Sequence, residues 1–293
     1  MGFELSKKLY ICEVMGLYNI AIKPFVRKMN IERASKVALR YFEIIEKIPL
    51  GRAISRLVHN NRPSGLQREV FGIQFYNPIG LGAGLDLYGE LYNDLNGLGF
   101  SFVEIGPMGI DGVRRAVKQL QKDPQKDILA ACINSDYLTA FALFYDFVDF
   151  FVIDISADPG TEVLDPILEA RLAEDVYKPI VVKLPRSITT LQMDEILDYS
   201  QLYRIDGIEA RNMDQLRHIV SYTQGRLPVI ANMHIETTAQ AVEAMDAGAS
   251  LVAVRNGLVR NGPKFVADIQ KVLLNKKKNE RAAAKPDRVP AEG

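Results

Sequence analysis

Lys183 is the side chain in this sequence with the widest choice of chemistry. It ends the apolar run Ile180–Lys183, where a buried and unpaired ammonium would be very costly. Three roles would avoid this cost. The ammonium could contact a bound ligand, or form an ion pair with Asp154 at the end of a neighbouring apolar run, or the amine could form a Schiff base with a substrate. No other feature supports the Schiff base, so we expect one of the first two roles.

Two further cationic side chains, His234 and Arg255, follow apolar runs late in the chain. Both suit a phosphate group, because side-chain cations bind phosphate well. In the alternative interpretation they pair with Glu209 or Asp154 and fill the space themselves. The three histidines of the chain fall on three separate elements, which is not the spacing of zinc ligands, so we predict no metal site.

The segment Asn77–Asp86 ends a buried strand in small residues that include Gly80, Gly82 and Gly84. Glycines at such a point let a flat ligand, or another part of the protein, approach the main chain closely. The pattern therefore fits a ligand site and also fits tight packing alone. Leu87 follows directly, at a point where a catalytic loop would be expected to carry a cation.

Short apolar runs alternate with helical segments eight times after Gly72. The expected strands are Ile79–Leu81, Phe102–Ile105, Ile128–Ile133, Phe150–Ile155, Ile180–Lys183, Gly207–Ala210, Val229–Ala231 and Leu251–Val254. The expected helices are Glu90–Gly97, Arg114–Gln121, Tyr137–Phe147, Leu164–Val176, Leu191–Gln201, Met213–Gln224, Thr237–Ala247 and Gly262–Leu274. Continuous apolar strands separated by helices are typical of a parallel sheet covered by helices. Eight such units predict an α/β fold, a closed (β/α)8 TIM barrel with its ligand site at the carboxyl ends of the strands. An open doubly wound sheet is the alternative.

Residues 1–62 are expected to form an N-terminal amphipathic helical region. Apolar residues recur at helical spacing from Tyr10 to Val26 between lysines and arginines, and a second helix is expected over Ile31–Ile48. A basic amphipathic helix favours contact with a membrane surface, although such a stripe also packs on its own protein. The barrel is expected to span residues 63–274. Residues 275–293 have few large apolar side chains and are expected to be a disordered tail.

The composition excludes several classes of protein. Basic and acidic side chains number 36 each, so the chain lacks the basic surface of a nucleic-acid-binding protein. Cys12 and Cys132 are too few for a disulfide framework and favour a reducing compartment. No apolar stretch reaches the length of a spanning helix, and no secretory signal is evident. We expect a cytoplasmic protein that is peripheral on the inner face of the cytoplasmic membrane.

Short motifs along most of the chain carry a resemblance to a known family. They are Lys23–Lys28, Glu32–Ala34, Phe71–Ile73, Asn77–Asp86, Leu98–Gly106, Asp206–Ile208, Ala247–Val252, Gly257–Leu258 and Gly262–Pro263. In this order and spacing they resemble the class 2 dihydroorotate dehydrogenases, which are quinone-linked and membrane-associated. The resemblance implies the barrel fold and the cofactor FMN. The positions that we expect to bind this cofactor are Ala83, Gly84, Asp154, Lys183, Asn212, Arg255 and Gly257.

The chain departs from the family at the positions that carry the chemistry. Leu87 stands where the family has a lysine that contacts flavin and substrate. Ala157 stands at the position of the catalytic base, and an alanine cannot accept a proton. After the second strand, Pro107 replaces a threonine and the loop that ends in a substrate-binding asparagine is largely missing. Met233 and His234 replace a glycine pair that cradles the flavin phosphate.

We therefore predict an FMN-type barrel that resembles dihydroorotate dehydrogenase but has little or no dihydroorotate oxidation. One alternative is a functioning dihydroorotate:quinone oxidoreductase of pyrimidine biosynthesis with an atypical base, Ser156 or Asp158. Another is a non-enzymatic, membrane-associated barrel that binds a partner or a small ligand, either flavin or another small anion. Residues 1–50 would be the part that reaches quinone and the membrane surface.

Overall fold

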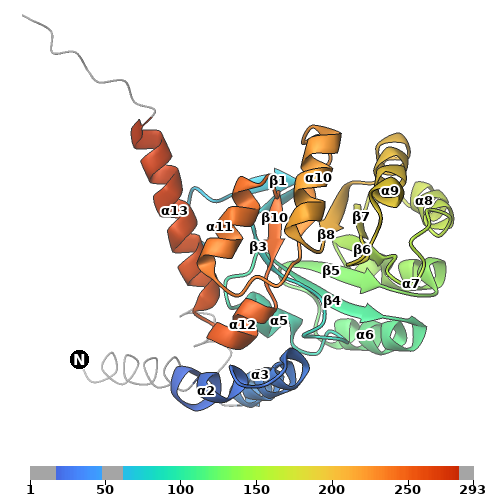
Figure 1. Cartoon of the computed structure of the whole chain (residues 1–293). Coiled ribbons are helices and arrows are strands. Elements are labelled where there is room, and N and C mark those ends of the chain that lie inside the picture. Colours follow the sequence, from blue (N-terminus) through green and yellow to red (C-terminus); the bar gives the residue numbers. More distant parts are fainter. Residues whose placement is uncertain (1–17, 48–61, 284–293) are drawn as a thin grey trace, which may run out of the picture.

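Eight buried apolar runs form the strands of a closed parallel barrel, as the sequence predicts (Figure 1). The computed structural model describes residues 18–47 and 62–283. The strands follow one another around the ring in the order β10-β3-β4-β5-β6-β7-β8-β9. They are β3 (Ile79–Leu81), β4 (Phe102–Met108), β5 (Ile128–Ile133), β6 (Phe150–Asp154), β7 (Ile180–Lys183), β8 (Gly207–Ala210), β9 (Val229–Ala231) and β10 (Leu251–Ala253). The open doubly wound sheet is thereby excluded.

Helices follow each of the eight strands and surround the ring (Figure 1). They are α5 (Tyr92–Asn96), α6 (Ile110–Lys122), α7 (Tyr137–Phe144) with the 3-10 turn η2 (Tyr145–Phe147), α8 (Asp165–Leu172), α9 (Thr190–Leu202), α10 (Met213–Thr223), α11 (Thr238–Asp246), α12 (Asn256–Asn261) and α13 (Phe265–Ala283). Thr189 and Thr237 begin α9 and α11 with reciprocal capping bonds to a glutamine at the third helical position. The last helix extends to Ala283, so residues 275–283 are helical where a disordered tail was expected.

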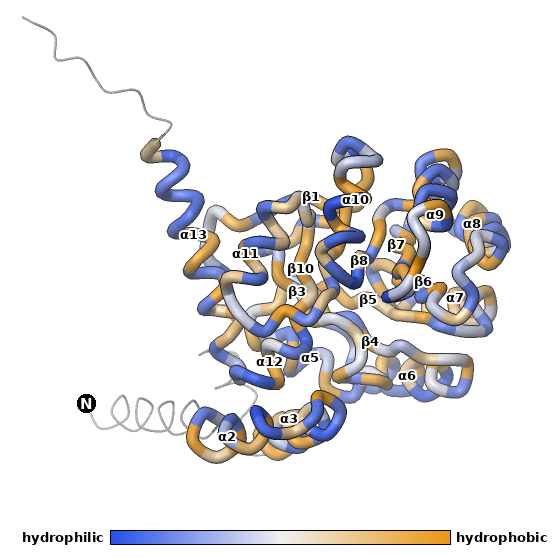
Figure 2. Tube along the Cα trace, viewed as in Figure 1, coloured by the Kyte–Doolittle hydropathy of each residue, from blue (hydrophilic) through white to orange (hydrophobic). Residues whose placement is uncertain are grey.

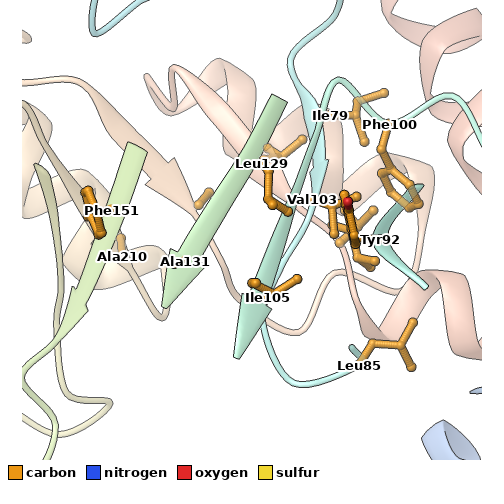
Figure 3. Close-up of a cluster of buried hydrophobic side chains, with 14 of the residues drawn as sticks. Ile79, Leu85, Tyr92, Phe100, Val103, Ile105, Leu129, Ala131, Phe151 and Ala210 are labelled. Carbon is orange, nitrogen blue, oxygen red and sulfur yellow. The ribbon is translucent and has the colours of Figure 1, made fainter. Parts of the chain in front are cut away.

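Alternation along each strand divides the core into two clusters. Side chains such as Val103, Leu129 and Phe151 point outward and pack under the helices (Figure 3). Their neighbours Phe102, Ala130 and Phe150 point into the ring. Figure 2 shows hydrophobic residues along the strands and hydrophilic segments on the surrounding helices. This period of two decides which polar residues enter the barrel.

A short hairpin that the sequence analysis missed closes the amino-terminal end of the barrel. It consists of β1 (Arg68–Val70) and β2 (Ile73–Phe75), joined by Phe71 and Gly72. Both turn residues have positive φ, 56° and 78°, as a two-residue type I′ turn requires. The ring centroid of Phe75 lies 5.7 Å from that of Phe102, and the ring of Phe71 lies 6.0 Å from that of Phe150. These rings fill the end of the barrel opposite to the carboxyl ends of the strands.

The described N-terminal residues pack against α12, the short helix that follows β10. They form a π-helical turn η1 (Tyr18–Ile22), then α2 (Lys23–Val26) and α3 (Ile31–Lys47). The Tyr18 hydroxyl donates to the carbonyl of Val259 at 2.5 Å, and the Arg260 guanidinium donates to the carbonyl of Met29 at 2.9 Å. Within the described residues, no helix has the length and apolar character needed to cross a membrane. The expected first helix begins outside the described part, and its described portion from Tyr18 to Val26 forms η1 and α2.

Candidate functional site

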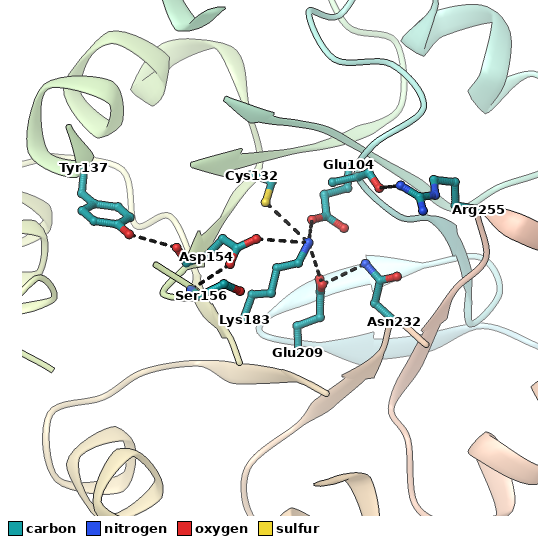
Figure 4. A network of polar contacts seen from close by, with 10 residues as sticks. Glu104, Cys132, Tyr137, Asp154, Ser156, Lys183, Glu209, Asn232 and Arg255 are labelled. Atoms are coloured by element: carbon teal, nitrogen blue, oxygen red, sulfur yellow. Dashed lines mark hydrogen bonds and ion pairs between the residues drawn. The ribbon is translucent and has the colours of Figure 1, made fainter. Parts of the chain in front are cut away.

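A polar layer lies inside the barrel above the apolar plug (Figure 4). Glu104 follows the inward-facing Phe102 by two residues on β4, and Lys183 follows Val181 by two residues on β7. Glu209 lies on β8, directly beside Lys183 in the strand register. Strand alternation therefore sends these three charged side chains into the ring, where Glu104 and Glu209 are at most 1% exposed and Lys183 is 3% exposed.

The ammonium of Lys183 is the centre of this layer. Its Nζ lies 3.0 Å from Glu209 Oε1, 3.4 Å from Glu104 Oε1 and 3.8 Å from Asp154 Oδ2. The ion pair expected between Lys183 and Asp154 is present, but Asp154 is the most distant of the three acids. The Asn232 amide donates to Glu209 Oε1 at 2.8 Å and extends the network toward β9.

The buried acids outnumber the single lysine. Burial and the neighbouring Glu104 raise the pKa of Glu209 to about 7, so a proton is held on this acid well above the usual range. Glu104 Oε2 and Glu209 Oε2 are buried and have no hydrogen-bond partner among the residues that the structure describes. A proton on one of the two glutamates reduces the repulsion between them.

Lys183 itself remains an ammonium. Burial disfavours its charged form, but the three surrounding acids outweigh burial and hold its pKa well above the usual value. A Schiff-base lysine needs a depressed pKa, so the contacts argue against that role. Cys132 lies 3.7 Å from Lys183 Nζ, and burial raises the pKa of its thiol well above the ordinary value. This cysteine belongs to the core of the barrel and remains protonated.

The glycines of the first barrel strand face side chains of their own protein. A Cβ on Gly80 would overlap the ring of Phe102, and a Cβ on Gly82 would lie 2.8 Å from the Asn232 amide. A Cβ on Gly84, which has a φ of +101°, would overlap the guanidinium of Arg255. The surface that could accept a flat ligand is therefore covered by these three side chains.

Little space remains at the centre of the mouth. The cavity there measures about 40 Å³ and is lined by Ala83, Lys183, Arg186, Arg211, Asn232, Met233, His234, Arg255 and Asn256. One water molecule takes about 30 Å³ of liquid volume, whereas small-molecule pockets measure about 300–1,000 Å³. A flavin ring does not fit this space in the described arrangement, and the residues present do not form its cradle.

Other residues assigned to cofactor binding have local structural partners. Asn212 caps α10, because its Oδ1 accepts from the Gln215 amide at 2.8 Å. Gly257 is buried at the start of α12, and a Cβ there would overlap the ring of Phe265. Ala83 accepts a 3.5 Å hydrogen bond from Arg255 through its carbonyl.

The residues around the expected base position lie in the loop after β6. Ser156, Ala157 and Asp158 are all exposed, and the Ser156 amide donates to Asp154 Oδ1 at 3.0 Å. Leu87 is 41% exposed in the loop after β3. None of these four residues lines the 40 Å³ cavity.

The expected pairing of His234 and Arg255 with acids is wrong for the described residues. Asn256 Nδ2 lies 2.6 Å from His234 Nδ1, and Arg255 contacts Ala83 and Asn256. The acids Glu209 and Asp154 instead surround Lys183. The sequence analysis did not identify Glu104 as a partner of Lys183, although its position two residues after Phe102 is a signal that it faces inward.

Comparisons with known proteins agree with the fold. A family model described as dihydroorotate dehydrogenase matches residues 208–276. A protein of Christiangramia forsetii named dihydroorotate dehydrogenase (quinone) is 25% identical over 340 residues, covering 89% of this chain and 99% of that protein. A protein of the same name from Nitrosospira multiformis is 27% identical over 348 residues, covering 88% of this chain and 96% of that protein. Both alignments are longer than this chain, so the relatives contain segments that have no counterpart here.

Solved structures show the same barrel. Dihydroorotate dehydrogenase of Eimeria tenella in complex with ferulenol superposes with a TM-score of 0.66 at 18% identity, covering 73% of this chain and 85% of that one. The ligand-free form from the same organism superposes with a TM-score of 0.65 at 17% identity, covering 81% of this chain and 95% of that one. At this level of identity the likeness shows the fold.

Proposed function

We propose that this chain, a divergent relative of the quinone-linked dihydroorotate dehydrogenases, retains their barrel but does not oxidise dihydroorotate through FMN. The observation that carries the proposal is the covering of Gly82 and Gly84 by Asn232 and Arg255. Asn232 is held in place by its 2.8 Å hydrogen bond to the buried Glu209. A flavin would have to displace a side chain that is anchored inside the barrel.

The residues at the positions for proton and hydride transfer also argue against oxidation of dihydroorotate. Oxidation of dihydroorotate requires a base to take one proton while a hydride leaves for an acceptor. By the resemblance, the base position is Ala157, which has no group able to take a proton. Loss of a general base costs about 10²–10⁴-fold in rate. Leu87 likewise supplies no cation for flavin or an anionic substrate.

The test is the absorption spectrum of the purified full chain, before and after incubation with FMN. We expect a colourless protein that does not quench flavin fluorescence in a saturable way, and no quinone reduction with dihydroorotate. The dihydroorotate dehydrogenase of Nitrosospira multiformis, assayed in parallel, is the matched positive control. Stoichiometric flavin together with turnover at that control's rate would overturn the proposal.

A functioning oxidoreductase with an atypical base is the second candidate. The hydrogen bond from the Ser156 amide to Asp154 holds the start of the loop after β6 next to the polar layer, and Ser156 and Asp158 both belong to this loop. If dihydroorotate turnover is found, Ser156→Ala and Asp158→Asn identify the base. The candidate requires that one of the two substitutions abolish turnover while flavin remains bound.

Membrane contact through the N-terminal region is a separate part of the proposal. Ile20, Phe25 and Ile44 are 77%, 62% and 59% exposed in a region that also carries exposed lysines and arginines. Apolar and basic side chains together favour binding to an anionic lipid surface. Co-sedimentation with vesicles of anionic lipid should be lost in the double variant Ile20→Ser, Phe25→Ser. It should persist in Leu172→Ser, which removes an 85% exposed leucine from α8.

A further inference from the structure

A second cavity lies beside the barrel axis, at the carboxyl ends of β7, β8 and β9. It measures about 300 Å³ and is lined by Arg186, Arg211, Asn212, Met213, Met233, His234, Ile235, Gln240 and Glu243. Arg186, Arg211 and His234 also line the smaller central cavity, together with Arg255. We propose that Arg186, Arg211 and His234 bind the phosphate group of a small phosphate monoester. This inference goes beyond the proposed loss of flavin oxidation.

The arginines around this site form no salt bridge with any acid of the described residues. In the part of the chain that the structure describes, no carboxylate lies within 4.0 Å of the guanidinium of Arg186, Arg211 or Arg255. The one acid among the lining residues, Glu243, pairs with Arg217 at 3.2 Å. Arg186 and Arg211, which line the cavity and repel each other, are stabilised by an anion that bridges them.

The repulsion between these arginines lowers the pKa values of two of them. Burial, followed by Arg211, lowers the pKa of Arg186, and burial followed by Arg211 and Arg186 lowers the pKa of Arg255. Arg211 Nε is buried, and no hydrogen-bond partner for it occurs within residues 18–47 and 62–283. The side chain of Arg211 thus retains donor capacity at the edge of the cavity.

Gln215, which is 4% exposed, fixes the two loops that carry the arginines. Its Oε1 accepts from the Arg211 amide at 2.7 Å, while its Nε2 donates to the carbonyl of Pro185 at 2.7 Å and to that of Arg186 at 3.4 Å. One buried amide therefore joins the end of β8 to the loop after β7. The main-chain positions of Arg186 and Arg211 are therefore fixed relative to each other before any ligand binds, which reduces the entropy lost on binding.

His234 supplies a third donor from the loop after β9. Burial and the nearby Arg186 and Arg255 lower its pKa, so its ring is neutral at pH 7. The Asn256 amide donates to Nδ1, which places the ring proton on Nε2. The site thus combines two guanidinium groups and one neutral imidazole N–H around a cavity of limited size.

This arrangement favours a phosphate monoester over a carboxylate. A phosphate dianion has three terminal oxygens and approaches two negative charges near neutral pH, which matches two arginines that have no acidic partner. The volume of about 300 Å³ lies at the lower end of small-molecule pockets, so the organic part of the ligand is small. The donors are side chains, whereas the flavin phosphate cradle implied by the resemblance depends on backbone amides at Gly257 and a glycine pair.

The test is titration calorimetry of the full chain in phosphate-free buffer. The probes are glycerol phosphate, inorganic phosphate, FMN and acetate, each used alone. We expect saturable 1:1 binding of glycerol phosphate and inorganic phosphate, and at least tenfold weaker binding of acetate. Arg211→Gln and Arg186→Gln should each weaken glycerol phosphate about tenfold or more, because each removes charge-assisted hydrogen bonds. Arg114→Gln, which removes the same charge from a 64% exposed side chain on α6, should leave binding unchanged.

The remaining outcomes separate this proposal from the previous one. Binding of phosphate that weakens equally in Arg211→Gln and Arg114→Gln would show non-specific attraction and overturn the site. Should Arg211→Gln fail to fold, Arg211→Lys keeps the charge and must still bind more weakly, because lysine lacks the forked donors. Saturable FMN binding that survives Arg211→Gln would contradict the proposed loss of flavin without bearing on the phosphate site. Absence of phosphate binding in a colourless, folded protein would overturn the phosphate site alone.

Discussion

The Lys183 ammonium lies 3.0 Å from the Glu209 carboxylate, and both side chains are almost completely inaccessible to solvent. Glu104 and Asp154 approach the same ammonium from two other strands. In a barrel interior that is otherwise filled by apolar side chains, one cation holds three acids together. The charged side chains that would face a ligand are therefore paired with one another inside the protein.

Removal of Lys183 should destabilise the fold strongly. In Lys183→Met the three acids keep their positions but lose their shared cation, and breaking a buried ion pair in this way costs about 3–5 kcal/mol. Equilibrium urea unfolding would measure the loss of free energy. The exposed control is Lys264→Met, which breaks an ion pair on α13 with a 60% exposed lysine and should change stability by about 0.5 kcal/mol or less.

The double variant Lys183→Met, Glu209→Gln tests the cause of that loss. Glutamine keeps an acceptor for Asn232 and removes one of the uncompensated acids, so the double variant should be more stable than the sum of the single effects predicts. Strictly additive effects would mean that the lysine does not act through Glu209.

The raised pKa of Glu209 predicts a pH dependence of stability. Its pKa is about 7 in the folded chain, against 4.5 as the ordinary value, so the folded state binds more protons than the unfolded state between these limits. Stability from this group is complete below pH 4.5 and is lost as the pH rises through about 7. Urea unfolding from pH 5 to 8 should show this decline in the wild type and a flatter profile in Glu209→Gln. Glu280→Gln, on the exposed end of α13, should follow the wild type.

The strands could be predicted from sequence because each is a continuous apolar run between helices. Five of the eight expected strands, including Ile180–Lys183 and Gly207–Ala210, have the same bounds in the structure. The hairpin at Arg68–Phe75 was missed because its strands have three residues each and give no clear period. The extension of α13 was missed because polar residues gave no apolar stripe, although lysine, glutamate and alanine all favour helix.

The polar layer was harder to foresee than the fold. Glu104 and Lys183 are separated by 79 positions in sequence and by three steps around the ring, so only closure of the barrel brings them together. Asp154 was identified as a partner because its strand is adjacent to that of Lys183. Asn232, after β9, covers Gly82, after β3, and β10 lies between these two strands in the ring. No local sequence pattern predicts such a contact.

Substitution of Gly80 tests whether the glycines serve packing. A Cβ at Gly80 would overlap the fully buried ring of Phe102, and overpacking of this kind costs about 1–3 kcal/mol. Gly80→Ala should therefore lower the urea midpoint. Phe102→Leu should cost less stability in the Gly80→Ala background than in the wild type, since the smaller side chain leaves room for the methyl group. A neutral Gly80→Ala would show that the ring moves freely and that glycine is kept there for another reason.

Restoring the base alone should not restore oxidation of dihydroorotate. Ala157→Ser returns a hydroxyl to the position that the resemblance assigns to the base, but Asn232 and Arg255 still cover Gly82 and Gly84. We expect no dihydroorotate-dependent reduction of quinone by this variant in the presence of added FMN. The Nitrosospira multiformis relative, assayed under the same conditions, sets the rate to be detected. Turnover by Ala157→Ser would mean that flavin reaches the mouth of the barrel and that the missing hydroxyl is the main obstacle to activity.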